Sequence, residues 1–287
     1  MITVDRAASS TLFSRRLLAA QPLSEFVRTT GQWTVFIVQT LVLLPLTVGR
    51  YRRQALQQMN GLAWGRGSLI VDGGVVSVLL LLGIAVGASS AIEAFAVLNI
   101  IGFGALSGIV SGVGAVRVIG PLVGGIAFAS QTGCRMTAEI GAMRISEEID
   151  AVEAMGLRPI PFVVGTRLVG GLVCVVPGYL ITLVTTFFVM DLVIRLFHRQ
   201  PGGTYNHYFV EFLTPTDLAY SVLKVVVYCS AVTVIHCYYG YFASGGPVGV
   251  GQASGRAVRA SLVTIMVLDF FLTVVLWGLQ PAFVFKG

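Results

Sequence analysis

The chain has 287 residues, of which 55% are hydrophobic and only 11% are charged, against about 25% charged residues in a typical soluble domain. The mean hydropathy is +0.85. These values exclude a disordered chain and disfavour a soluble enzyme, so they indicate an integral membrane protein. The formal net charge of +6 does not require nucleic acid as a partner, because the arginines fall in short segments between apolar runs, as membrane topology favours.

Windows without charged residues recur along the whole chain, and a spanning helix needs about 20 mostly apolar residues. Only α-helices and closed barrels span lipid, and the windows do not alternate as barrel strands would. We predict an all-α, polytopic membrane protein with an N-terminal interfacial helix and five transmembrane helices. The predicted segments are a basic cytoplasmic arm over 1–30 and a membrane domain over 31–287, with the interfacial helix over 31–50 and spans over 68–91, 94–134, 163–190, 218–243 and 258–284.

The first apolar segment, Gln32–Val48, is short and contains Pro45. Three arginines follow it almost at once, at positions 50, 52 and 53. This pattern is typical of a helix that lies in the interface with its charged end at the lipid headgroups. A full span is the alternative.

The connections between spans are predicted from polar residues and glycines. Glu93 is expected to turn the chain after the first span, and the long segment 94–134 is expected to break near Gly102 and Gly104. Residues 195–217 are expected to form a polar loop and residues 244–255 a glycine-rich turn.

Orientation follows from the lysines and arginines. If residues 1–66, 134–167 and 244–259 lie inside, that side holds fourteen basic residues, whereas the other side holds Arg195, Arg199 and Lys286. Positive residues favour the cytoplasmic side. The chain is therefore expected in the cytoplasmic (inner) membrane, with its N-terminus in the cytoplasm.

Small residues recur at a spacing of four within the apolar segments, a pattern that lets helices approach closely. Such contacts could form within one chain or at the seam between two chains. The pairs are Gly83 with Gly87, Gly108 with Gly112, and Gly120 with Gly124.

No familiar catalytic pattern is present. Neither lysine follows a glycine, as a phosphate-binding loop requires, and the three histidines are far apart in sequence. We therefore expect no catalytic residue, cofactor or metal in this chain. Energy for any transport must come from a partner or from an ion gradient.

A polar segment over 141–156 stands between two apolar ones. It predicts a short amphipathic helix that Ser146 caps and Gly156 ends. At helical spacing, three acidic residues share one face and three apolar residues share another. The acidic residues are Glu147, Asp150 and Glu153, and the apolar ones are Ile149, Val152 and Met155. The segment is either a solvated connector or a helix that docks on a cytosolic partner with a basic groove.

Three charged residues lie inside or beside apolar windows: Arg117, Lys224 and Asp269. An intramembrane charge costs about 2.5–3.5 kcal/mol on insertion scales, so such residues are usually paired or functional. Lys224 and Asp269 fall on the fourth and fifth spans and could pair. They are candidates for a structural pair or for a substrate path.

Several motifs in order resemble the MlaE/YrbE permease family, the membrane subunits of Mce-type lipid ABC transporters. The most specific is Glu139-Ile-Gly-Ala-Met-Arg-Ile-Ser-Glu-Glu-Ile-Asp-Ala-Val-Glu-Ala-Met-Gly-Leu-Arg-Pro159. Arg117-Val-Ile-Gly-Pro121, the lysine at 224, Gly245–Gly251 and Val267–Thr273 are further similarities. The chain departs from the family at several positions. Val118 replaces a glutamate beside Arg117, and Thr166 replaces a proline.

The resemblance implies an interfacial helix, five spans and a permease dimer, and the departures favour a second YrbE-like permease over a homodimer. It also implies a cytosolic ABC ATPase dimer that binds ATP and Mg, extracytoplasmic MCE proteins, and a fatty acid, phospholipid or sterol-like cargo. The residues expected to couple to the ATPase are Glu147, Glu148, Asp150, Glu153, Met155 and Gly156. An ion-coupled secondary transporter that uses Asp269 and a non-conducting scaffold are the alternatives.

Overall fold

The computed structural model describes residues 27–65, 74–198 and 201–278. Most of the predicted arm, residues 68–73 of the first predicted span and residues 279–284 of the last predicted span lie outside these residues. Throughout the described part the chain is helical and contains no strand, and five segments are long and apolar enough to cross a membrane. The predicted all-α polytopic fold is confirmed.

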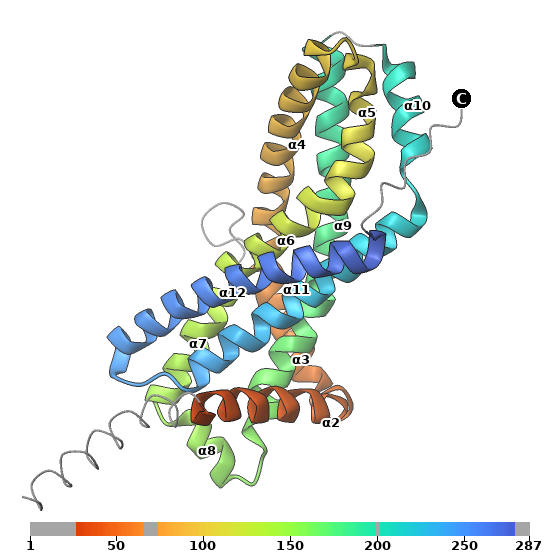
Figure 1. Cartoon of the computed structure of the whole chain (residues 1–287). Coiled ribbons are helices and arrows are strands. Elements are labelled where there is room, and N and C mark those ends of the chain that lie inside the picture. The colour runs from red at the N-terminus through yellow and green to blue at the C-terminus, as the bar shows by residue number, and fades with distance from the viewer. Residues whose placement is uncertain (1–26, 66–73, 199–200, 279–287) are drawn as a thin grey trace, which may run out of the picture.

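The five segments form an elongated bundle (Figure 1). Segments two and three pass through short π-helical stretches without interrupting the helical path. The first, fourth and fifth segments are single helices: α4 (Val75–Ile100), α11 (Pro215–Tyr241) and α12 (Gly246–Trp277). The second segment, Ser107–Ile145, consists of α5 (Ser107–Ile109), η2 (Val110–Ile119), α6 (Gly120–Phe128), η3 (Ala129–Gly133) and α7 (Cys134–Ile145). The third segment, Ile160–Leu196, consists of η4 (Ile160–Gly165) and α9 (Thr166–Leu196).

The N-terminal helix lies crosswise at one end of the bundle (Figure 1). It consists of Val27–Val42 and α2 (Leu44–Arg50), which meet at an angle of 41°, and α3 (Arg52–Trp64) follows. The Thr47 hydroxyl donates to the Pro161 carbonyl at 3.2 Å, and Trp33 stacks on Tyr238. This crosswise course favours the interfacial prediction, although length and composition alone would allow a sixth span.

The boundaries of the first two spans differ from the prediction. α4 continues past Glu93 to Ile100, because one exposed carboxylate near the end of a long apolar helix does not terminate it. The turn comes at Gly102, which has a φ of +78°, and η1 (Gly104–Leu106) leads into the second span. The predicted break near Gly102 and Gly104 therefore separates two spans rather than interrupting one.

Two predicted loops are largely helical. The region expected to be a polar loop contains α10 (Gly202–Phe212), whose Tyr205 is buried against the second span. Burial raises the pKa of the Tyr205 phenol to about 12, so this side chain stays neutral. The glycine-rich segment 244–255 turns within two residues, Gly245 and Gly246, which have φ values of +90° and +70°. α12 begins there, twelve residues earlier than predicted.

Intrachain neighbours account for all three glycine pairs. A side chain at Gly83 or Gly87 would collide with α9 at Thr182 or Thr186. Gly108 and Gly112 face α10, and Gly120 and Gly124 face Tyr179 of α9. These pairs therefore serve packing within one chain.

The core lies between α4, α6, α7, α9 and α11, with Tyr179, Tyr228 and Phe128 among its largest buried side chains. α12 is more peripheral. Only 11% of its most apolar window is buried, against 50% for α11. Ile265, Leu268 and Leu272 are the residues of α12 that pack in this core.

Candidate functional site

Four charged residues meet where η2, α11 and α12 come together. We call Arg117, Asp217, Lys224 and Asp269 the charge cluster. Lys224 is fully buried, and its Nζ lies 2.6 Å from Asp269 Oδ1. The same ammonium donates to the Arg117 carbonyl at 2.8 Å and to Thr273 Oγ1 at 2.9 Å. These three acceptors match the three donors of a lysine, and the predicted pairing of Lys224 with Asp269 is confirmed.

Arg117 pairs with Asp217 through two parallel contacts. Nε lies 3.1 Å from Oδ1 and Nη2 lies 3.2 Å from Oδ2, the two-pronged geometry of strong arginine–carboxylate pairs. The Asp217 carboxylate also accepts from Thr214 Oγ1 at 2.7 Å and from the indole nitrogen of Trp277. Asp217 therefore ties η2 to the far end of α12.

Sequence reasoning missed Asp217 because it falls in the segment read as a polar loop. A local signal was available: Thr214 and Asp217 stand three residues apart, as in a capping box. In the structure the Thr214 side chain accepts from the Asp217 amide, and α11 begins at Pro215. The cap positions the carboxylate that Arg117 requires.

The cluster contains two cations and two anions, and each has a specific partner. Asp269 also accepts from the Tyr228 hydroxyl at 2.7 Å. Because both carboxylates are engaged by cations and by neutral donors, neither is a free acceptor for a transported ion. The ion pairs and hydrogen bonds of the charge cluster connect η2, α11 and α12 to one another.

The second candidate region lies at the lower end of the bundle in Figure 1, where α8 (Glu148–Ala154) projects. We call residues 146–156 the coupling turn. α7 ends at Ile145, and Glu147 adopts a left-handed conformation with a φ of 59°, the one non-glycine residue in the described part of the chain with positive φ. The predicted helix over 141–156 is therefore two helices with a sharp turn between them.

Ser146 does not cap α8 as predicted. Its single hydroxyl proton has two acceptors within reach, the Ala142 carbonyl at 3.0 Å and the Glu148 carboxylate at 2.9 Å. Ser146 thus ends α7, because a hydroxyl can satisfy a carbonyl four residues earlier in a helix. No side chain caps α8 at its N-terminus.

The predicted faces of the coupling turn are correct only in part. Ile149 and Val152 are buried, but Met155 follows the last residue of α8 and is 68% exposed. Glu147 precedes the helix, so only Asp150 and Glu153 share the acidic face. Asp150 accepts from Arg144 of α7 at 2.7 Å, which leaves an exposed surface formed by Glu147, Glu148, Glu153, Met155 and Gly156.

The α7 helix that carries this turn is braced by ion pairs. Glu139 lies 2.8 Å from Arg135 Nε and 3.3 Å from Arg167 Nη2. Arg135 also donates to the Gly61 carbonyl of α3 at 3.0 Å. These contacts join α3, α7 and α9, so a displacement of α7 would be transmitted to both neighbours.

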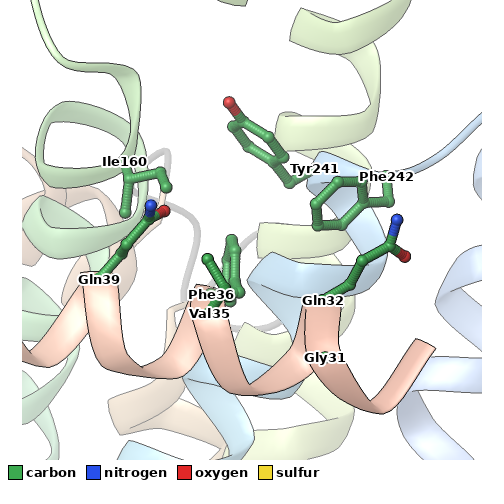
Figure 2. Close-up of a pocket in the computed structure, with 8 residues that line it drawn as sticks. All are labelled: Gly31, Gln32, Val35, Phe36, Gln39, Ile160, Tyr241 and Phe242. Atoms are coloured by element: carbon green, nitrogen blue, oxygen red, sulfur yellow. The ribbon is translucent and has the colours of Figure 1, made fainter. Parts of the chain in front are cut away.

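A hollow of about 440 Å³ opens beside the N-terminal helix (Figure 2). Val35, Phe36 and Gln39 of that helix form one wall, and Ile160 and Tyr241 stand on the other. No sequence motif pointed to this hollow, because its walls are ordinary apolar residues brought together by the crosswise course of the N-terminal helix.

Comparisons with known proteins find similarity to permeases. A family model described as Permease MlaE matches residues 67–275. A probable ABC transporter permease protein of Rickettsia prowazekii is 27% identical over 169 residues, which cover 55% of this chain and 61% of the relative. The intermembrane phospholipid transport system permease protein MlaE of Haemophilus influenzae is 26% identical over 163 residues, covering 56% of this chain and 62% of the relative.

A plant protein is similar over a comparable stretch. TRIGALACTOSYLDIACYLGLYCEROL 1, a chloroplastic protein of Arabidopsis thaliana, is 27% identical over 165 residues, which cover 55% of this chain and 45% of the relative. By these matches the chain spans about three-fifths of the length of the bacterial relatives. The matched region contains both the charge cluster and the coupling turn.

Proposed function

This chain belongs to the MlaE permease family, and from that premise we propose that it is the permease subunit of an ATP-driven, Mce-type lipid transporter in the cytoplasmic membrane. The Haemophilus influenzae relative is named for intermembrane phospholipid transport, which supports a lipid cargo. The chain would be a non-catalytic subunit, with its N-terminus in the cytoplasm and with ATP and Mg bound by a partner ATPase dimer.

The observation that carries the proposal is the coupling turn. It projects from the bundle between the second and third spans, and its tip carries three exposed carboxylates, at positions 147, 148 and 153. Met155 adds an exposed apolar side chain beside them. The three carboxylates complement a partner groove with basic residues at its edge, and Met155 complements an apolar centre of the same groove.

The turn is also built to transmit force. Arg144 holds α8 to α7 through Asp150, and α7 is braced on α3 and α9 through Glu139 and Arg135. A movement of an ATPase bound to α8 would therefore be passed to α3, α7 and α9 together. A subunit that has no nucleotide site of its own needs such a connection to respond to ATP hydrolysis in its partner.

The remaining parts of the assembly follow from the family. A second YrbE-like permease would complete the transport path, with a heterodimer favoured over a homodimer, and extracytoplasmic MCE proteins would receive or deliver the lipid. α12 exposes Val263, Phe270 and Phe271, which are apolar surfaces compatible with fatty, phospholipid or sterol-like cargo.

The test is to tag the full chain, extract it in mild detergent, and identify co-purifying proteins and lipids by mass spectrometry. We expect an ABC ATPase, a second permease and MCE proteins. Charge reversal of Glu147 and Glu148 to lysine should abolish recovery of the ATPase while the chain still inserts. Glu211→Lys is the matched control, because Glu211 is exposed on α10 at the other end of the bundle.

Unchanged ATPase recovery from the charge-reversed chain would remove the coupling turn from the proposal. Recovery of the folded chain without any ATPase would instead favour the ion-driven alternative. The geometry disfavours that alternative, because Asp269 is already engaged by Lys224 and by Tyr228.

A further inference from the structure

Two neighbouring hollows run along the N-terminal helix on the side that faces η4 and the end of α11. Each has a volume of about 440 Å³, within the range of ligand pockets. Gln39 and Ile160 line both, so the two hollows adjoin at these residues. We call the pair of hollows the interfacial groove.

The walls of the interfacial groove are mostly apolar, with Gln32 and Gln39 as polar side chains of the N-terminal helix. Val35 and Phe36 line one part, and Val38 and Val42 line the next. All three valines are more than half exposed. From Gly31 to Leu43 the helix rises about 18 Å at about 1.5 Å per residue. The residues that line the groove therefore extend over about 18 Å of this helix.

One end of the interfacial groove carries a cation. Arg158 lines the second hollow and is exposed. Within the described residues its guanidinium has neither an ion pair nor a side-chain hydrogen bond, whereas Arg144, Arg135 and Arg167 at the same end of the bundle all pair with carboxylates. A guanidinium offers a planar fork that matches phosphate oxygens.

The surrounding charge has one sign. Residues 27–65 contain four arginines, at positions 28, 50, 52 and 53, and no aspartate or glutamate. All four arginines are exposed. A cluster of arginines beside an apolar surface attracts anionic lipid headgroups, at about 1 kcal/mol per basic residue near the membrane surface.

We propose that the interfacial groove binds one anionic phospholipid, with an acyl chain between the N-terminal helix and Ile160 and with the headgroup phosphate at Arg158. The proposal does not depend on the proposed transport function, since it requires only that the N-terminal helix lie at the interface. Because residues 158–161 follow the coupling turn within five residues, a bound lipid would brace the chain segment that leaves α8.

The test uses the full chain in nanodiscs of phosphatidylcholine that contain a minor fraction of a photoactivatable lipid. The probe is phosphatidylglycerol with a diazirine in its acyl chain, and the same label on phosphatidylcholine is the comparison. Cross-linked peptides are mapped by mass spectrometry. We expect phosphatidylglycerol to label peptides of residues 31–43 and 158–161 about five-fold more than phosphatidylcholine, the factor that corresponds to about 1 kcal/mol.

Arg158→Gln should lower this headgroup preference, whereas Arg256→Gln should leave it unchanged. Arg256 is an exposed arginine of α12 that does not line the groove. A second variant tests the acyl part: Val35→Phe should lower labelling by both lipids, and Val48→Phe, at an exposed position outside the groove, should not. Each variant is used only after its thermal unfolding profile matches that of the parent chain.

Three results would overturn the proposal. Equal labelling by the two lipids would show ordinary boundary lipid. An equal loss of preference in Arg158→Gln and Arg256→Gln would show a diffuse charge effect. Cross-links between two copies of the chain at residues 31–43, without lipid adducts, would show that the groove is a protein interface.

Discussion

The charge cluster and the coupling turn place charged residues under opposite conditions. In the cluster, Lys224 is fully buried and the Asp217 side chain is only 7% exposed. In the turn, the Asp150 side chain is 56% exposed. A buried ion loses its water and needs a partner to replace it, whereas an exposed ion remains hydrated. The cluster is therefore expected to determine whether the spans assemble, and the turn to determine what binds to them.

The largest effect is expected from breaking the buried pair. Lys224→Met leaves Asp269 without its cation, and Asp269→Leu leaves Lys224 without its anion. Removing one partner of a buried pair costs about 3–5 kcal/mol, so each change should sharply lower the yield of folded chain in size-exclusion chromatography. The double change Lys224→Met with Asp269→Leu should recover much of that yield, because apolar residues can replace a buried pair.

That double variant also separates a structural pair from a functional one. If the pair only joins α11 to α12, the double variant should fold and transport lipid once the whole transporter is reconstituted. If it folds but transport is lost, the two charges take part in the substrate path. A double variant that is as poorly folded as either single variant would contradict the pairing argument.

The next effect is expected at Asp217. Asp217→Asn keeps the shape but removes the charge that engages Arg117, and a hydrogen bond to a charged group is worth about 1.5–3 kcal/mol. The matched control is Asp191→Asn, which weakens the exposed pair with Arg195 at 2.6 Å. Exposed pairs four residues apart in a helix contribute about 0.3–0.5 kcal/mol. In detergent, the thermal unfolding midpoint of Asp217→Asn should be well below that of Asp191→Asn. Equal midpoints would contradict the argument that the buried pair contributes more to stability than the exposed one.

Sequence reasoning succeeded where a pattern is local and failed where distant segments meet. The apolar windows predict five spans, since a spanning helix must satisfy its own backbone and so follows from composition. The pairing of Lys224 with Asp269 was predictable because both charges stand in apolar windows. Asp217 was missed because its importance comes from Arg117, one hundred residues away.

The coupling turn illustrates the same limit at short range. Helical periodicity over 147–155 suggested one helix capped by Ser146, but Glu147 precedes α8 in a left-handed turn, and Met155 follows α8 and is exposed. Periodicity assigns faces only to residues that continue one helix. The interfacial groove has no sequence signal, because the crosswise N-terminal helix creates it.

A smaller effect, in the opposite direction, is expected at Glu147. Its left-handed backbone costs a residue with a side chain about 1–2 kcal/mol, and glycine avoids that cost. Glu147→Gly should therefore raise the unfolding midpoint while it lowers ATPase recovery. Glu148→Gly is the control, since Glu148 begins α8, where glycine is unfavourable. A lower midpoint for Glu147→Gly would indicate that the left-handed turn is not maintained in solution.

The smallest effect on stability is expected from the exposed pair between Arg144 and Asp150, because such pairs contribute about 0–1 kcal/mol. The effect of this pair on ATPase binding is more informative than its effect on stability.

Arg144→Gln removes the partner of Asp150 but keeps the charge of Asp150, whereas Asp150→Asn removes that charge and weakens the pair. If the pair acts by holding α8 against α7, both variants should reduce ATPase recovery equally. If Asp150 itself contacts the ATPase, only Asp150→Asn should reduce recovery. Unchanged recovery in both would restrict the coupling surface to Glu147, Glu148, Glu153, Met155 and Gly156.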